Sequence, residues 1–420
     1  MPKEVCGVPM TQTKTTTLFR KTGETFHAGA KTLQQRYFLS PDIFAEELEK
    51  IFARQWVLVG HQSQLGEAGN YFIAEVAGES LILASDQQST IRGFYNVCRH
   101  RGSRLLEDQN GNAAAIQCPY HAWTYGLDGR LLGVPHMSDV PGFNKTDYSL
   151  HPVNLALWEG FIFVNLADAS TRLRRSTARQ AERDGYTSLE KWFAPLAGKF
   201  SRWNLPALRS AKRVEYDVRG NWKLIFENYS ECYHCLGVHP ELSKISPYDS
   251  AENDLTEGPF LGGFMRIAKG KSLTMSGNAC ALGIADSPHA HDRGQQRKND
   301  RDYEQEHEHE RTHRVFYYSI FPNMLLSLHP DYVMVHQLWP QSPERTLILC
   351  DWFFHQEAFR RGDFNPDDAI QFWDMVNRQD WHVCELSQQG ISSRAYEPGP
   401  YSARESIPAA WDEYYLRQMR

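Results

Sequence analysis

Three features that mark common functional classes are absent from this sequence. No apolar run approaches the roughly eighteen residues that a membrane-spanning helix needs. The first thirty residues are rich in Thr and Lys and lack the apolar core of a secretory signal, so they are expected to form a loose tail. The net charge is only −6, with a pI near 6.3, which gives no reason to expect nucleic acid or an anionic membrane as partner.

A disulfide framework is also missing. The eight cysteines lie at positions 6, 98, 118, 232, 235, 280, 350 and 384, and their spacing follows no framework pattern. Because two of them belong to the metal motif described next, reduced thiols in a cytoplasmic protein are the simpler interpretation. The chain has no internal repeats, and 420 residues with 41% hydrophobic content suffice for two or three globular domains.

Two short loops each carry one cysteine and one histidine. Cys98 and His100 are two residues apart, Cys118 and His121 are three apart, and seventeen residues separate the pairs. In a Rieske 2Fe-2S cluster two thiolates hold one iron and two imidazoles hold the other. Gly102 follows the first pair, where the backbone must turn close to the inorganic sulfurs. The pattern therefore predicts a Rieske cluster that transfers electrons one at a time.

A zinc site is the alternative interpretation of these loops, because two Cys and two His also satisfy tetrahedral zinc. Zinc fingers, however, usually pair Cys with Cys and then His with His. Here each loop carries one of each, the mixed order that divides the ligands between two irons. The order of the ligands therefore favours the cluster.

A second metal site is predicted around residues 231–239. The segment from Asn221 is helical in character to about Leu236, which places Glu231 and His234 on one helical face. His239 follows His234 by five residues, so both rings can meet one ion only if the helix ends or bends, and Gly237 supplies that break. Two histidines with one carboxylate form the facial triad that non-heme Fe(II) uses to keep positions open for O₂.

The third ligand is predicted on a C-terminal helix. Between Ala369 and Cys384 the apolar positions recur at helical spacing, and the stripe is interrupted at Asp380. An ionised side chain in a buried stripe is costly unless it is paired or binds a metal, so Asp380 is the expected ligand. Cys232 and Cys235 form C-x-x-C, a redox or zinc signal elsewhere, but without a second pair nearby they are interpreted as two small buried packing residues.

The fold class expected from the pattern is α+β. Short alternating segments between residues 56 and 165 predict antiparallel strands that carry the two cluster loops. Three further strands are predicted at 314–327, 332–339 and 346–354. Residues 286–314, dense in charge and containing His307, His309 and His313, predict a solvated, mobile insertion rather than a metal site.

The chain resembles the large, or alpha, subunits of the Rieske non-heme iron oxygenases from about Arg36 to the C-terminus. The motifs that carry the resemblance are Cys98-Arg-His-Arg-Gly, Cys118-Pro-Tyr-His-Ala-Trp-Thr-Tyr, Asn221-Trp-Lys and Glu227-Asn-Tyr-Ser-Glu-Cys-Tyr-His-Cys-Leu-Gly-Val-His-Pro. The resemblance implies an N-terminal tail with helices packing on the catalytic domain (1–45), a Rieske domain (46–165) and a helix-grip catalytic domain (166–420). It also implies a mononuclear Fe(II), an NAD(P)H-dependent flavin or iron-sulfur reductase, and a head-to-tail homotrimer.

The same resemblance implies a role for Glu231 and a substrate class. An acidic residue three before the first histidine ligand bridges the two metal centres in this family, and Glu at that position resembles the branch that acts on glycine betaine, proline betaine, choline or carnitine. The implied reaction hydroxylates an N-methyl group, with demethylation and release of formaldehyde. An aromatic-ring dioxygenase and, more distantly, a Rieske electron carrier without catalysis are the alternatives.

Overall fold

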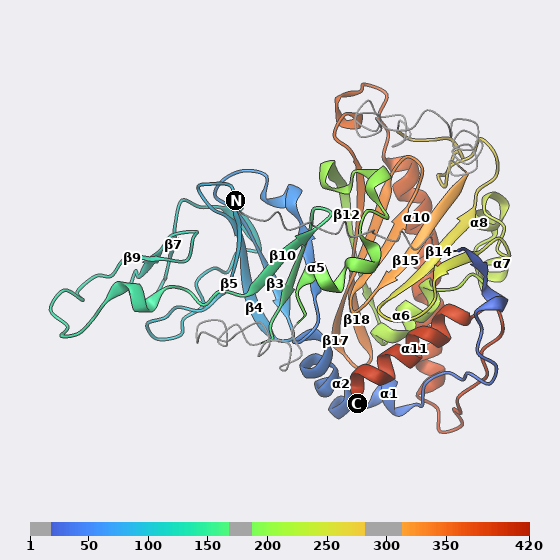
Figure 1. Cartoon of the computed structure of the whole chain (residues 1–420), viewed down its shortest axis with the longest axis horizontal. Coiled ribbons are helices and arrows are strands. Elements are labelled where there is room, and N and C mark those ends of the chain that lie inside the picture. Colours follow the sequence, from blue (N-terminus) through green and yellow to red (C-terminus); the bar gives the residue numbers. More distant parts are fainter. Residues whose placement is uncertain (1–17, 168–186, 282–312) are drawn as a thin grey trace, which may run out of the picture.

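The computed structural model describes residues 18–167, 187–281 and 313–420, which form an elongated molecule with two parts (Figure 1). The predicted α+β class is confirmed. The insertion predicted at 286–314 lies almost wholly outside the described residues. No helix in the described ranges is both long and apolar enough to cross a membrane.

The N-terminal part is built from three antiparallel sheets. A four-stranded sheet has the order β5-β4-β3-β6, and two three-stranded sheets have the orders β10-β11-β2 and β7-β8-β9. Their bounds are β2 Val57–His61, β3 Asn70–Val76, β4 Glu79–Ser85, β5 Ile91–Tyr95, β6 Asn110–Asn112, β7 Ile116–Gln117, β8 Thr124–Tyr125, β9 Leu131–Gly133, β10 Asn154–Trp158 and β11 Phe161–Asn165. The small sheet β7-β8-β9 occupies the outer end of the molecule (Figure 1).

The second part contains one eight-stranded antiparallel sheet, in the order β1-β13-β14-β15-β16-β17-β18-β12. The strands are β1 Arg20–Lys21, β12 Leu208–Val218, β13 Glu252–Leu255, β14 Phe260–Arg266, β15 Arg314–Ile320, β16 Met324–Leu328, β17 Val333–Ser342 and β18 Arg345–His355. The prediction of one strand over 314–327 was wrong. A turn at 321–323, which contains Pro322 and so lacks one backbone donor, divides it into β15 and β16.

Among the described residues, three longer helices and several short ones accompany this sheet. The longest, α10 (Asp367–Ile391), confirms the helix predicted from the apolar stripe, and Phe372, Trp373, Val376 and Cys384 are buried on it. It packs against α6 (Trp222–Tyr229), which also contacts α11 (Ser406–Met419). The shorter helices are α1 Arg36–Leu39, α2 Pro41–Glu47, α5 Leu189–Trp192, α7 Cys235–Val238 and α8 Pro240–Ile245.

A buried ion pair fixes the N-terminal helices to the catalytic part. Glu47, at the end of α2, accepts hydrogen bonds from Lys223 Nζ at 2.5 Å, Trp222 Nε1 at 2.8 Å and Tyr415 Oη at 2.5 Å. The carboxylate and the ammonium are both fully buried. Removing one partner of such a pair leaves an uncompensated buried charge, which typically costs about 3–5 kcal/mol. Helix α2 therefore fixes the start of α6, and α6 leads into the segment that contains the predicted metal ligands His234 and His239.

Candidate metal centres

The two cysteine–histidine loops have the same backbone conformation. The N–H of Gly102 donates to the carbonyl of Cys98, and the N–H of Ala122 donates to that of Cys118, each at 3.1 Å. The two donor residues of these turns lie in the left-handed region, with φ +74° for Gly102 and +55° for Ala122. Glycine adopts this conformation freely, whereas a β-carbon makes it costly. Two matched turns therefore present two cysteine–histidine pairs side by side.

The turns separate thiols from imidazoles. Cys98 and Cys118 are buried and in hydrogen-bonding contact, while the rings of His100 and His121 lie 4.7 Å apart, with His100 exposed. His121 Nδ1 is buried and has no hydrogen-bond partner among the described residues. A buried ring nitrogen without a partner is costly, and a metal ion would satisfy it. Burial raises the pKa of Cys118, but backbone N–H groups of Tyr120 and His121 outweigh it and lower that pKa, which favours the thiolate that iron requires.

The geometry of the four residues fits a two-iron cluster better than one zinc ion. Bonds of about 2.0–2.3 Å around tetrahedral zinc would bring the four ligand atoms within about 4 Å of one another. In the described part of the chain, the one group of three or more His, Cys, Asp or Glu residues whose ligand atoms all lie within 4.8 Å is a different one. The candidate ligand atoms of the two loops are therefore not gathered as tightly as one zinc ion requires, which favours a cluster whose ligands divide between two irons.

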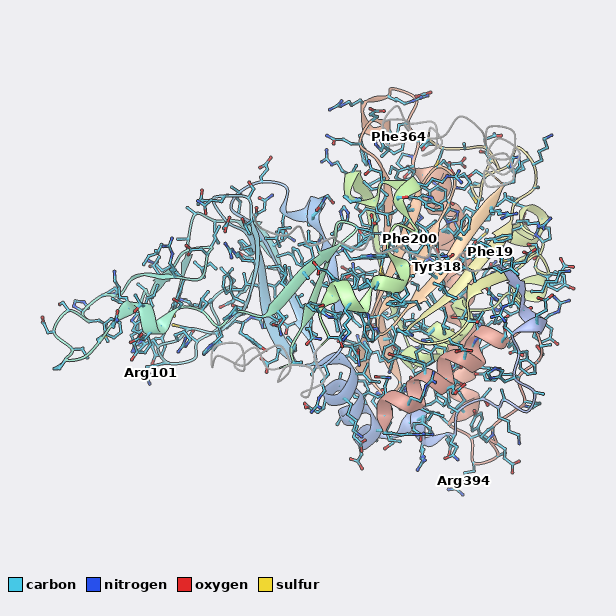
Figure 2. All side chains as sticks on the ribbon, viewed as in Figure 1. Phe19, Arg101, Phe200, Tyr318, Phe364 and Arg394 are labelled. Atoms are coloured by element: carbon cyan, nitrogen blue, oxygen red, sulfur yellow. A yellow bond between two sulfur atoms is a disulfide. The ribbon has the colours of Figure 1, made fainter. Side chains whose placement is uncertain are left out.

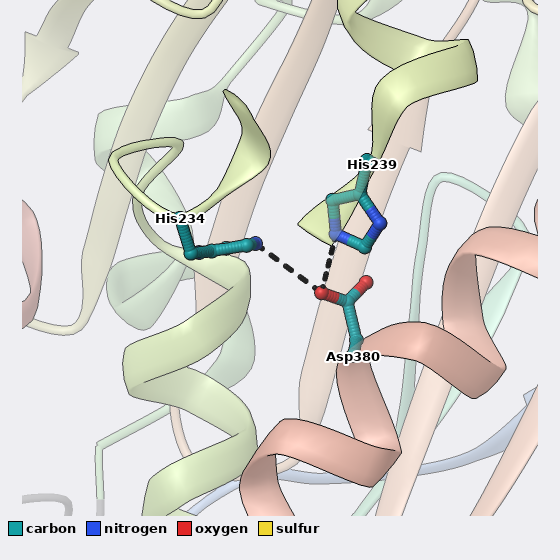
Figure 3. Close-up of side chains that lie close together, drawn as sticks. All are labelled: His234, His239 and Asp380. Carbon is teal, nitrogen blue, oxygen red and sulfur yellow. Dashed lines mark hydrogen bonds and ion pairs between the residues drawn. The ribbon is translucent and has the colours of Figure 1, made fainter. Parts of the chain in front are cut away.

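That compact group consists of His234, His239 and Asp380, drawn together in Figure 3. Asp380 Oδ1 lies 3.2 Å from His234 Nε2 and 2.8 Å from His239 Nε2. His234 precedes α7, His239 separates α7 from α8, and Asp380 lies on α10, so the group joins segments about 140 residues apart. The structure thereby brings together the three residues that the sequence predicts as ligands. Two imidazoles and one carboxylate on one side of an ion leave its other positions open.

The electrostatics of this group favour a positive charge at its centre. Burial works to lower the pKa of His234, but hydrogen bonds to Asp380 and Glu231 outweigh it and raise that pKa to about 10. Burial likewise works to raise the pKa of Asp380, and its hydrogen bonds to the two histidines lower it overall. The carboxylate is therefore ionised and oriented, as a cation ligand must be.

Two neighbours orient the rings through their other nitrogens. Glu231 Oε1 lies 2.5 Å from His234 Nδ1, and Gln379 Oε1 lies 2.7 Å from His239 Nδ1. Each contact directs the Nε2 atom of its ring toward Asp380 and fixes the tautomer that a metal needs. Glu231 does not belong to the compact group itself. Gln379 was not predicted from the sequence, although its place beside Asp380 on the same helix was an available signal.

The local structure around Glu231 differs from the prediction. The helix expected to reach Leu236 ends at Tyr229, so Glu231 and His234 do not share a helical face. Instead, the carboxylate of Glu231 accepts hydrogen bonds from the backbone N–H groups of Tyr233 and His234. A short polar turn replaces the last helical turn, because side-chain acceptors of this kind compete with the helical backbone pattern. Glu231 and His234 meet through the turn.

The interpretation of Cys232 and Cys235 as reduced packing residues was also wrong. The two residues form a disulfide that encloses Tyr233 and His234. Both cysteines are largely buried, so the packing part of the expectation agrees with the structure. The error arose because no sequence framework supports a disulfide, whereas the turn after α6 brings the two sulfurs together.

A cavity that opens to solvent adjoins His234, His239 and Asp380. Its walls come from α6, α7, α10 and the central strands, and aromatic rings contribute much of the lining. Cys98 and Cys118 do not line it. The catalytic part therefore combines a candidate mononuclear metal site with room for a small organic molecule.

A cluster domain joined to a domain with a two-histidine, one-carboxylate group beside a cavity defines a class of protein, the two-centre iron oxygenases. Comparison with known families agrees. The Rieske [2Fe-2S] domain matches residues 55–144, and the catalytic domain of the ring-hydroxylating alpha subunits matches residues 205–420. The chain belongs to the Rieske oxygenase alpha subunits and is the catalytic subunit of a non-heme iron oxygenase.

Individual relatives cover nearly the whole chain. The glycine betaine monooxygenase oxygenase subunit of Chromohalobacter salexigens is 30% identical over 89% of this chain and 82% of its own. The carnitine monooxygenase oxygenase subunit of Escherichia coli is 29% identical over 87% and 86%. A solved quaternary ammonium Rieske monooxygenase is 25% identical with a TM-score of 0.73, covering 96% of this chain and 100% of that one. Naphthalene 1,2-dioxygenase from Rhodococcus, at 20% identity and TM-score 0.69, shares the fold.

Proposed function

We propose that this oxygenase subunit removes an N-methyl group from a quaternary ammonium compound. The observation that carries the proposal is the cavity beside His234, His239 and Asp380, which combines aromatic faces with carboxylates. The relatives that act on glycine betaine and carnitine support the same substrate class. A monooxygenation of this kind uses O₂, two electrons and two protons, forms water and an N-hydroxymethyl product, and that product decomposes to formaldehyde and the demethylated amine.

The aromatic lining suits a cation that has no N–H donors. Tyr229, Tyr317, Trp373 and Trp381 line the cavity. The polar ends of two rings are engaged elsewhere, because Tyr229 Oη lies 2.8 Å from Ser327 Oγ and Trp373 Nε1 donates to Tyr332 Oη at 2.6 Å. Such rings offer their π faces, which attract quaternary ammonium groups.

The acidic lining also separates this proposal from the aromatic-ring alternative. Glu231, Asp249 and Asp380 all line the cavity, but Glu231 and Asp380 are engaged with the candidate metal group. The remaining negative charge, that of Asp249, favours a cationic ligand over a neutral aromatic hydrocarbon. An electron carrier, the more distant alternative, needs neither the cavity nor the second metal site.

In this proposal His234, His239 and Asp380 hold one Fe(II), and the two cysteine–histidine loops hold one Rieske cluster. When bound, the iron supplies O₂ activation and the cluster supplies electrons one at a time. Glu231 orients His234, and Gln379 orients His239. The disulfide-closed turn that follows the buried α6 carries His234, and Glu231 lies just before that turn; both residues line the cavity.

We further propose that electrons pass between subunits of a homotrimer. Arg101, beside His100, lies at the outer end of the N-terminal part, whereas α7 lies at the opposite edge of the molecule (Figures 1 and 2). Large apolar side chains are exposed at both places: Tyr120, within the second cysteine–histidine loop, is 56% exposed, and Leu236, on α7 two residues after His234, is 62% exposed. In a head-to-tail ring, the surface around Tyr120 of one subunit would pack against the surface around Leu236 of the next. This contact would bring the exposed edge of His100 toward Glu231 of the neighbouring subunit. An NAD(P)H-dependent reductase would supply the electrons.

Oxygen uptake with a surrogate reductase tests the proposal. The iron-loaded enzyme would be supplied with glycine betaine, proline betaine, carnitine, choline and, as contrast, naphthalene and aromatic acids. We expect uptake with at least one quaternary ammonium compound, coupled to stoichiometric formaldehyde. Dihydroxylation of an aromatic ring, without formaldehyde from any quaternary ammonium compound, would contradict it. Three irons per chain are expected, against two for an electron carrier.

A further inference from the structure

The cavity carries one guanidinium whose role the proposed reaction does not explain. Arg404 is the one Lys or Arg among the described residues that line the cavity. Removing a methyl group from a cation requires no second cation nearby, and a positive charge in the same cavity opposes binding of that cation. Arg404 therefore needs a role of its own.

Arg404 lies at the opening of the cavity to solvent, which we call the mouth. Arg404 and Asp249 are both exposed, whereas His239 and the carboxylate of Asp380 are largely buried. Arg404 lies in the segment just before α11, and Asp249 follows α8, so different elements supply the mouth and the metal group. A ligand that places its cationic end near the iron group can direct its other end toward this mouth.

The Arg404 guanidinium contacts an aromatic ring, and this contact leaves its N–H groups free. Its central carbon lies 5.0 Å from the centre of the Tyr248 ring, which also lines the cavity. Among the hydrogen bonds and ion pairs of residues 18–167, 187–281 and 313–420, Arg404 contributes only its backbone N–H, to Ser402 Oγ at 3.2 Å. Stacking on a ring fixes the guanidinium plane and leaves its N–H edge free for a planar, bidentate acceptor.

We propose that Arg404 binds a carboxylate of the substrate, so that the substrate class is the zwitterionic betaines rather than choline-like alcohols. The inference rests on the proposed function, since it assumes that the quaternary ammonium group occupies the aromatic end. A carboxylate is the planar anion that the free guanidinium edge matches. The hydroxyl of choline carries no charge and gains far less from this contact.

Binding to the iron-loaded enzyme tests the inference without turnover. Anaerobic calorimetric titrations without reductase would give the Kd of glycine betaine, γ-butyrobetaine and choline for the wild type, Arg404→Gln and Arg404→Lys. We expect Arg404→Gln to raise the ratio of betaine Kd to choline Kd about 10- to 100-fold, as loss of a charged hydrogen bond does. Arg404→Lys keeps the positive charge but loses the paired N–H donors of the guanidinium. It should therefore raise the ratio less than Arg404→Gln does.

Two further variants separate a specific contact from a general effect. Arg394→Gln removes a guanidinium from the exposed surface at the lower edge of the molecule (Figure 2), away from the cavity lining, and should leave all three Kd values unchanged. Asp249→Asn removes a negative charge from the same mouth, so it should weaken choline binding more than betaine binding and lower the ratio of betaine Kd to choline Kd. A rise of that ratio in Asp249→Asn, equal to the rise in Arg404→Gln, would show that the shape of the mouth matters and not the charge of Arg404.

The outcomes keep the two proposals apart. If betaines bind the wild type and Arg404→Gln leaves the betaine-to-choline ratio unchanged, the inference is overturned while the proposed function stands. The inference would also be overturned, and the proposed function would stand, if the wild type bound choline more tightly than both betaines. If no quaternary ammonium compound binds, the proposed function fails, and the inference fails with it.

Discussion

The two candidate metal sites are built in contrasting ways. The cluster loops lie within 24 residues and repeat one turn, in which the residue four after each cysteine donates its N–H to the cysteine carbonyl. The group of His234, His239 and Asp380 joins a turn after α6 to a helix about 140 residues later. The first site depends on local backbone conformation, and the second depends on the packing of α10 against α6.

This contrast determines what each site tolerates. A local turn forms with few long-range contacts, so the cluster site depends mostly on its own ligands. The assembled site needs supporting residues that hold separate elements in register, such as Gln379 and the buried pair of Glu47 and Lys223. Substitutions outside the ligands should therefore affect the second site more than the first.

The largest effect is expected from removing a cluster ligand. Cys98→Ser or His121→Ala leaves one iron with a single protein ligand, so the visible absorption of the cluster should be lost completely. The mononuclear site should still load iron, because its ligands come from other elements. Absorption and EPR spectra with iron analysis check this, and Cys280→Ser, at a cysteine away from both sites, is the control. An intact Rieske EPR signal in Cys98→Ser would contradict the assignment.

Loss of the distant carboxylate should remove only the second centre. Asp380→Ala leaves two neutral imidazoles to hold a dication, so mononuclear iron and turnover should be lost while the cluster spectrum stays normal. Glu385→Gln, a carboxylate on the same helix that pairs with Arg219, is the matched control. Full activity of Asp380→Ala would mean that another carboxylate completes the site.

A supporting residue should have an intermediate effect at the assembled site alone. Gln379→Leu removes the acceptor for His239 Nδ1, and loss of such an orienting contact typically costs about 10- to 100-fold in metal affinity or activity. Gln371→Leu, at an exposed position of the same helix, should change neither. Iron competition with a chelator measures the loss; equal iron affinity in both variants would show that His239 needs no orienting partner.

The smallest effect concerns the pH dependence of the helices that support the second site. Glu227 Oε1 on α6 and Asp412 Oδ1 on α11 are buried without a donor, and burial raises both pKa values, that of Asp412 to about 7. A raised pKa means that the folded state binds protons more tightly than the unfolded state. Stability should therefore fall as pH rises from about 4 to 7, by at most about 1.4 kcal/mol per pH unit for one group.

Asp412→Asn tests this dependence, because the amide cannot ionise. Thermal unfolding followed by tryptophan fluorescence should show a smaller decrease in midpoint between pH 5 and 8 in the variant than in the wild type. Asp363→Asn, at an exposed carboxylate paired with Arg361, is the control and should follow the wild type. Identical slopes in Asp412→Asn and the wild type would contradict a raised pKa of Asp412 in the folded protein.

The contrast also explains what the sequence could predict. The candidate cluster ligands and the stripe on α10 follow spacing rules, so Cys98, His100, Cys118, His121 and Asp380 could all be proposed from the sequence alone. The conformation after Tyr229 could not, because side-chain hydrogen bonds of Glu231 to backbone N–H groups compete with the helix that the pattern favours. The Cys232–Cys235 disulfide, Gln379 and the cavity position of Arg404 depend on tertiary packing, to which a single sequence gives no direct access.

The central claim is that the locally built site of one subunit supplies electrons to the assembled site of another through Glu231. Stopped-flow measurement of Glu231→Gln tests it most directly, since the amide keeps the size and removes the charge. We expect both metals to load normally and the reductase to reduce the cluster at the wild-type rate. Reoxidation of the cluster by O₂ in the presence of substrate should then be slower by at least 10- to 100-fold, the usual cost of losing such a partner. Reoxidation at the wild-type rate would contradict the account, and so would loss of the mononuclear iron, which would make Glu231 a ligand rather than a bridge.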